Sequence, residues 1–204
     1  PSADKPRVFD YEEVLTQTQI DTLEEKTRAI AEKYSIGVGI ITTAAKAELV
    51  EEALLQKLYR QMATLNKTAR DIMLRFRVHS CTDVTGFSLM GHSYEMAQGS
   101  GVSVHIESGR VPYHVEALEL AEMGFIPAGA YRNRDFVAGG VCVKGNISRA
   151  MEDILFDPQT SGGLLIAVDG DDAEVCLNAL RSEIPCAAQI GYVTKLQENH
   201  LILE

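Results

Sequence analysis

Helix-like and strand-like patterns alternate along most of this 204-residue sequence, and this alternation limits the possible folds more than any other feature. Apolar residues at helical spacing predict a long helix over 43–65, after a β-branched stretch at 36–42 that predicts a strand. Further helices are expected at 87–101, 113–124, 148–155 and 171–183, and further strands at 102–108, 164–168, 187–195 and 200–204. Interleaved elements of this kind predict an α+β fold, in which helices cover a mixed sheet.

One stretch breaks the alternation. Residues 126–140, "IPAGAYRNRDFVAGG", contain a proline and three glycines, and this density of turn-forming residues predicts a loop. Arg132, Asn133 and Arg134 in this stretch could contact a phosphate or a ribose, although arginine-containing loops are usually only solvated.

Charge and composition exclude several classes of partner. The formal net charge of -10 argues against a broad surface for nucleic acid or an anionic membrane. No apolar run approaches the ~20 residues of a membrane span. The four cysteines show no C-x-x-C spacing, which favours reduced thiols in a cytoplasmic protein over a zinc site. An anionic ligand would therefore need a bridging cation or a cluster of backbone amides.

The segment 79–92, "HSCTDVTGFSLMGH", places an aspartate between the end of a predicted strand and the start of a predicted helix. Ligands of α/β proteins bind at such junctions, where a carboxylate can bind Mg²⁺ and neighbouring amides can bind phosphate. Asp83 is the candidate ligand, with Thr82, Thr85 and Gly86 beside it. The alternative is that Asp83 or Thr85 caps the following helix, and the local pattern alone favours the cap. Cys81 is interpreted as a small packing residue.

A second polar turn occurs at 157–165, "DPQTSGGLL". Thr160, Ser161, Gly162 and Gly163 could present successive backbone amides as a nest for an anion. A proline-initiated turn that simply leads into a strand explains the same letters equally well. No Gly-Lys-Ser/Thr follows, so the turn is not a Walker loop.

Three separated motifs, "TDVTGFSLMGH", "PAGAYRNR" and "DPQTSGGLL", together resemble the C-terminal domain of selenophosphate synthetase (selenide, water dikinase) over about residues 36–204. The resemblance implies the fold shared with aminoimidazole ribonucleotide synthetase, and a reaction of ATP, selenide and water that gives selenophosphate, AMP and phosphate with Mg²⁺. It also implies that Asp83 helps to bind the metal, a role then preferred to the cap. Further members of the same cleft would be Thr82, Thr85, Gly86, Asn133, Thr160, Ser161, Gly162 and Gly163. Ser88 stands where the family pattern usually has glycine, which puts packing rather than chemistry in question.

The resemblance does not extend to the start of the sequence. Residues 6–39 look instead like the opening of a TPM domain, which suggests a natural or engineered chimera with a foreign segment at 1–40 and the synthetase-like domain at 41–204. The family's catalytic Cys and Lys belong to an N-terminal domain that these motifs do not include. We therefore expect a chain that is inactive alone, binds ATP and Mg²⁺ weakly or not at all, and could form a homo-oligomer. A chimeric scaffold with no catalytic function is the alternative.

Overall fold

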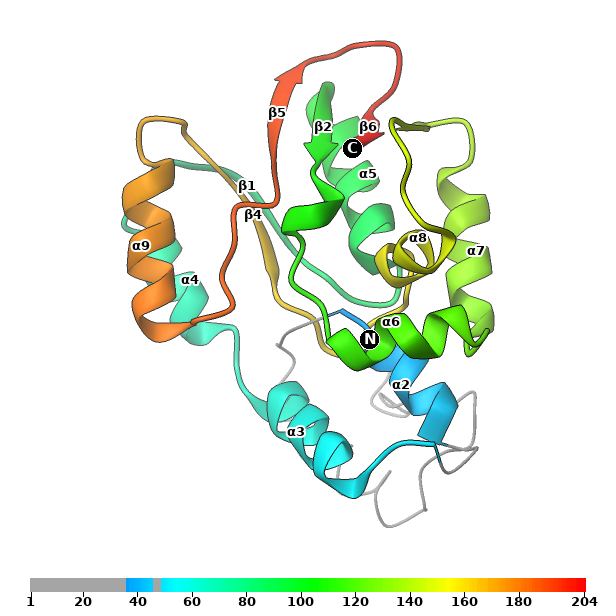
Figure 1. The fold of residues 1–204 in the computed structure, drawn as a ribbon. Coiled ribbons are helices and arrows are strands. Elements are labelled where there is room, and N and C mark those ends of the chain that lie inside the picture. Colours follow the sequence, from blue (N-terminus) through cyan, green and yellow to red (C-terminus); the bar gives the residue numbers. More distant parts are fainter. Residues whose placement is uncertain (1–35, 46–48) are drawn as a thin grey trace, which may run out of the picture.

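The computed structural model describes residues 36–45 and 49–204, and these form helices packed around two separate sheets (Figure 1). The larger sheet is mixed and has the strand order β3-β6-β2-β5, with β3 at Val141–Val143, β6 at Leu201–Leu203, β2 at Val102–Ile106 and β5 at Gly191–Lys195. The smaller sheet is an antiparallel pair of β1 (Val78–Asp83) and β4 (Leu164–Val168). The predicted α+β fold is confirmed, with the strands divided between two sheets.

Helix α5 (Ser88–Ser100) packs on β2 and β6 and joins the two sheets, because its N-terminal end follows directly from β1. Helices α7 (Ala128–Val137) and α8 (Arg149–Leu155) contact α5. Helix α6 (Val115–Glu122) packs against α8, and the short 3₁₀ helix η1 (Ser108–Arg110) precedes α6 in the chain. Helices α4 (Lys67–Met73) and α9 (Ala173–Glu183) pack against each other beside β1 and β4 (Figure 1). A continuous core of aliphatic side chains, including Met90, Ile106, Ile154, Leu155, Leu201 and Leu203, lies between the larger sheet and these helices.

The prediction of a strand at 36–42 is wrong, because most of this stretch belongs to the helix α2 (Val38–Ala45). Its apolar residues Val38, Ile40, Ile41 and Ala44 are buried, a spacing that gives α2 one apolar face against α6. The single helix predicted over 43–65 is also wrong in its start, because α3 covers only Glu52–Ala63. Tertiary packing has here overridden the strand propensity of the β-branched residues.

The loop predicted at 126–140 is also wrong for most of its length, because α7 occupies Ala128–Val137. Pro127 has the extended conformation of an N-cap residue, and Ala130, Asn133 and Val137 are buried on one face of the helix. Gly129 lies where a Cβ would be 2.8 Å from Cγ of Pro158. This glycine therefore serves close packing of the first turn of α7 rather than a chain reversal.

Helix α5 ends as its sequence predicts. Gly101 has a left-handed conformation with φ of 64°, and its backbone N–H donates to the last turn of the helix. All four cysteines are free thiols. Cys81 is exposed, so the packing role predicted for it is wrong. Within residues 36–45 and 49–204, no helix is long and apolar enough to cross a membrane.

Candidate functional site

The Asp83 carboxylate lies at the exposed end of β1. Side chains of β1 alternate between half-buried and exposed, so His79, Cys81 and Asp83 share the exposed face. Loss of solvation and then the charge of Asp83 raise the pKa of the Cys81 thiol, so this thiol is protonated at neutral pH. The strand thus presents one free carboxylate at its end.

The capping role considered for this aspartate is not what the structure has. The N-cap position of α5 is Phe87, and no side-chain hydrogen bond caps this helix. Thr85 contributes its backbone carbonyl, which accepts a bond of 2.8 Å from the N–H of Ser88. The hydroxyl of Thr85 instead lies 3.1 Å from Nε2 of His92. Asp83 therefore remains available to a ligand.

The turn at 157–163 lies directly against the loop that follows β1. The N–H of Val84 donates to the carbonyl of Gly163 over 2.8 Å, and the N–H of Gln159 donates to the carbonyl of Thr85 over 3.2 Å. A Cβ at Gly162 would lie 1.9 Å from the carbonyl oxygen of Val84, so this position admits only glycine. Two motifs that are about eighty residues apart in the sequence thus form one surface.

Asn133 connects the third motif to the same surface. Its side chain is buried, and Nδ2 donates to the carbonyl of Gly86 over 2.9 Å and to that of Phe156 over 3.1 Å. These bonds fix the loop after β1 against the end of α8. The amide of Asn133 is therefore placed to position the loop rather than to face a ligand. Next to it, Arg134 is paired with Asp153 over 2.9 Å.

The first part of the 157–163 turn has a structural role that the local pattern does not reveal. The carboxylate of Asp157 accepts bonds of 2.9 Å from the N–H of Gly39 and from Nε2 of Gln159. It thereby satisfies the N-terminal end of α2, more than a hundred residues away in the sequence. Asp157 is completely buried, and this burial raises its pKa to about 7 despite the hydrogen bonds that favour its charged form.

The predicted ligand-binding residues are therefore brought together, but they differ in exposure. Gly86 and Thr160 are exposed, and a Cβ at Gly86 would meet nothing within 4 Å. Thr82 and Thr85 are half-buried, and Thr82 donates to the backbone carbonyl of Asp83 over 3.2 Å. Ser161 has a buried hydroxyl for which the described part of the chain offers no hydrogen-bond partner.

Sequence reasoning missed Asn66, which supports the same turn from behind. It is almost completely buried between α3 and α4, and its Nδ2 donates to the carbonyl of Gly162 over 3.4 Å. No local pattern distinguishes this asparagine from a helix N-cap, because the contact depends on a residue that is 96 positions away.

A single carboxylate limits what this surface can hold. Among the described residues, no group of three or more His, Cys, Asp or Glu side chains is placed to hold a metal ion. Mg²⁺ is commonly bound by one or two carboxylates together with phosphate oxygens and water. The donor set of Asp83 and nearby hydroxyls therefore fits Mg²⁺ only as part of a larger site that other groups complete.

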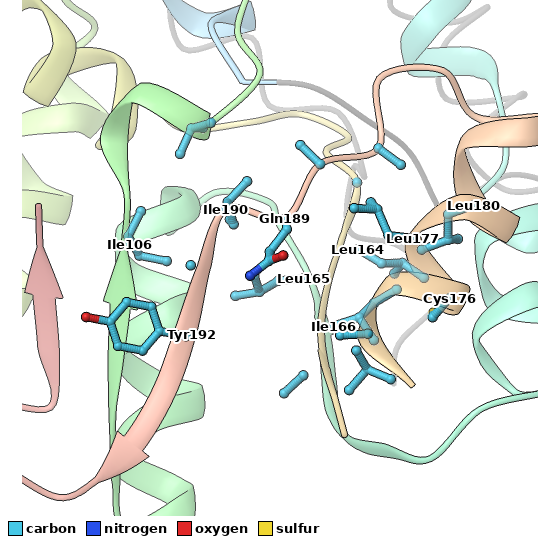
Figure 2. Close-up of a pocket in the computed structure, with 18 of the residues that line it drawn as sticks. Ile106, Leu164, Leu165, Ile166, Cys176, Leu177, Leu180, Gln189, Ile190 and Tyr192 are labelled. Carbon is cyan, nitrogen blue, oxygen red and sulfur yellow. The ribbon is translucent and has the colours of Figure 1, made fainter. Parts of the chain in front are cut away.

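Asp83 does not line the apolar cavity beside β4. Figure 2 shows this cavity, which has a volume of about 590 Å³. Val84 and Gly163 are among the residues that line it. From there it extends along β4 to α9, and its walls are mainly aliphatic. The carboxylate surface is consequently open, and it is separate from this apolar groove.

Comparison with known proteins identifies the family. Residues 29–204 match the family described as "AIR synthase related protein, C-terminal domain". A selenide, water dikinase of Clostridioides difficile is 51% identical over 167 residues, which are 81% of this chain and 48% of that protein. One from Treponema denticola is 46% identical over 171 residues, with 81% and 48% covered. The chain thus spans about half the length of the curated relatives it matches.

Solved structures show the same fold at low sequence identity. A crystal structure of E. coli HypE matches with a TM-score of 0.56 and 17% identity, over 80% of this chain and 42% of that one. A crystal structure of a HypE–HypF complex matches with a TM-score of 0.55 and 16% identity, over 84% and 47%. The family match begins at residue 29, inside the segment 1–40 that the sequence reading assigns to a foreign domain.

Proposed function

We infer the function of this chain from its family: it belongs to the AIR synthase related proteins, as a C-terminal domain of the selenide, water dikinase type. The role proposed for it is one half of a shared site for ATP and Mg²⁺, which works only when the other half of a dikinase faces it. The observation that carries this proposal is the junction of two motifs beside an exposed carboxylate, made by the bonds from Val84 to Gly163 and from Gln159 to Thr85.

Each part of the junction has a role in this proposal. Asp83 would supply one oxygen ligand to Mg²⁺. The positive charge of this ion would lower the repulsion between a nucleotide and a chain with a net charge of -10. Gly86 and Thr160 would line the open surface, where backbone can approach phosphate closely. Asn133, Asn66 and Gln159 would keep the loop and the turn in position through their bonds to backbone groups.

Activity of the isolated chain is not expected. Phosphoryl transfer requires several charged groups around the transferred phosphate and a positioned nucleophile. The described surface offers one carboxylate, and the relatives have about as much chain again outside the matched region.

Selenide-dependent release of phosphate from ATP by the purified chain tests this proposal. We expect no turnover above the background without protein, and no difference between the chain and Asp83→Ala. Turnover that Asp83→Ala abolishes would show a complete site and would contradict the half-site proposal. Asp71→Ala, which removes an exposed carboxylate on α4, is the matched control.

A further inference from the structure

We propose that the apolar groove beside β4 binds an extended polypeptide segment, which adds as a strand to the edge of β4. This segment belongs to the first half of a dikinase, which the matched region does not cover. The inference rests on the proposed function, because it names the partner of the half-site. It concerns a different surface, since Asp83 does not line the groove.

The groove follows the edge of a strand rather than the face of a sheet. Residues 163–170 and 186–193 all line it, without the alternation that a pocket on one face of a sheet would show. In Figure 2, β4 lies between the chain around Gln189 and Ile190 and the helix α9, which carries Leu177 and Leu180. The groove is thus bounded by backbone and aliphatic side chains.

On the groove side, the backbone groups of β4 have no hydrogen-bond partner among the described residues. Among the described residues, β4 pairs only with β1, and β5 pairs only with β2. The carbonyl of Gly163 accepts a bond from the N–H of Val84, and the N–H of Asp169 donates to the carbonyl of Arg77. The odd-numbered residues of β4 therefore point their backbone N–H and C=O groups toward β1. In an antiparallel pair the intervening residues point their N–H and C=O groups away. The backbone N–H and C=O groups of Leu164, Ile166 and Val168 therefore point toward the groove.

The aliphatic walls and the groove-facing backbone groups of β4 together indicate which class of ligand the groove could bind. A hydrocarbon would fill the aliphatic walls but would leave the amides of β4 without partners, at a cost for each buried group. An extended segment satisfies these amides and inserts alternate side chains into the groove. The chemistry that fits is a strand with apolar residues at every second position.

The origin of the segment follows from where the rest of a relative's chain is attached. The matched region is a C-terminal domain and covers about half of each dikinase, so in those proteins the remaining chain enters before the residue that corresponds to Ile36. Ile36 is itself buried and is one of the residues that line the groove. A segment of the first half would therefore reach β4 over a short distance.

Overlapping labelled peptides that cover the first half of the Clostridioides difficile relative, titrated against the full chain by fluorescence anisotropy, provide the test. We expect one short run of peptides with alternating apolar residues to bind. Ile166→Asp should weaken this binding by at least about tenfold, because it places a charge in the aliphatic groove. Val175→Asp, on an exposed position of α9 outside the groove, should leave it unchanged.

Amide hydrogen exchange of the unmodified chain gives a readout that does not depend on the variants folding. Bound peptide should slow exchange at Leu164, Ile166 and Val168. Absence of binding by every peptide, or protection at other positions only, would overturn the proposal. Protection of the same amides on raising the concentration of the chain alone would identify a second copy as the occupant and would also overturn it. None of these results depends on ATP or on Asp83, so a failed half-site is distinguishable from a failed groove.

Discussion

Ser88 has a backbone conformation that non-glycine residues rarely adopt. Its φ of 69° makes it the one non-glycine residue with positive φ in the described part of the chain, and its side chain is completely buried. The synthetase pattern usually has glycine at this position, and a left-handed φ explains that preference. The serine hydroxyl accepts a bond of 3.3 Å from the N–H of Gly91, which compensates in part.

Ser88→Gly should therefore stabilise the fold. Relief of left-handed strain contributes about 1–2 kcal/mol, and the greater freedom of glycine in the unfolded chain offsets about half of it. We expect the free energy of unfolding in urea to rise by about 0.5–1 kcal/mol. Ser88→Ala keeps the strained Cβ and loses the hydroxyl, so it should destabilise. A loss of stability in Ser88→Gly as large as in Ser88→Ala would contradict this explanation.

Asp157 should make stability depend on pH around neutrality. Its pKa is raised from 3.8 to about 7 in the folded state, so the folded state holds its proton more tightly than the unfolded state does. Stabilisation by this proton is complete below pH 3.8 and is lost as the pH rises through about 7. The free energy of unfolding should fall by about 2–3 kcal/mol between pH 5 and pH 8 from this group alone.

Asp157→Asn isolates this contribution, because the amide does not titrate. We expect the difference in unfolding free energy between the two proteins to change across pH 5–8 in urea titrations. A constant difference would show that Asp157 titrates normally. In that case the hydrogen bonds from Gly39 and Gln159 would offset the effect of burial on the pKa of Asp157.

At the scale of elements, the contact between the 157–163 turn and the loop after β1 depends on Gly162. A methyl group there would overlap the carbonyl of Val84, so Gly162→Ala must separate the turn from β1. We expect a loss of about 2–4 kcal/mol in unfolding free energy, because overpacking and a broken backbone bond act together. Gly86→Ala is the matched control in the partner motif, where a methyl group meets open space and should cost less than about 1 kcal/mol. Equal losses in both variants would contradict the proposed close contact.

Elements with a regular local pattern were predictable from the sequence, and elements held by distant residues were not. The spacing and the terminal glycine of α5 are local, and its prediction is confirmed. Helix α2 depends on Asp157 for its N-terminal amides, and α7 depends on Gly129 to approach Pro158. Strand propensity at 36–42 and turn-forming residues at 126–140 therefore predicted the wrong structures.

The residues of the candidate site divide in the same way, into those that a local motif predicts and those that depend on distant contacts. The motifs make Asp83 and the 160–163 turn candidates for one site, and the adjacency of these two segments follows from the pairing of β1 with β4. Asn66 and Gln159 act through contacts between distant segments, so only the folded structure reveals them.

At the scale of the whole molecule, the central claim is that residues 36–204 supply a working half of a dikinase site. The chain contains the family's C-terminal domain and matches about 48% of its relatives' length, so the claim is tested in a complete protein. The relevant protein is the Clostridioides difficile relative with its matched C-terminal region replaced by residues 36–204 of this chain.

The decisive measurement is selenide-dependent ATP turnover by this hybrid and by its Asp83→Ala and Asp71→Ala variants. We predict turnover in the hybrid, a loss of about 100-fold or more in Asp83→Ala because the proposed metal ligand is removed, and no loss in Asp71→Ala. A folded hybrid that turns over equally well with Asp83→Ala would contradict the account.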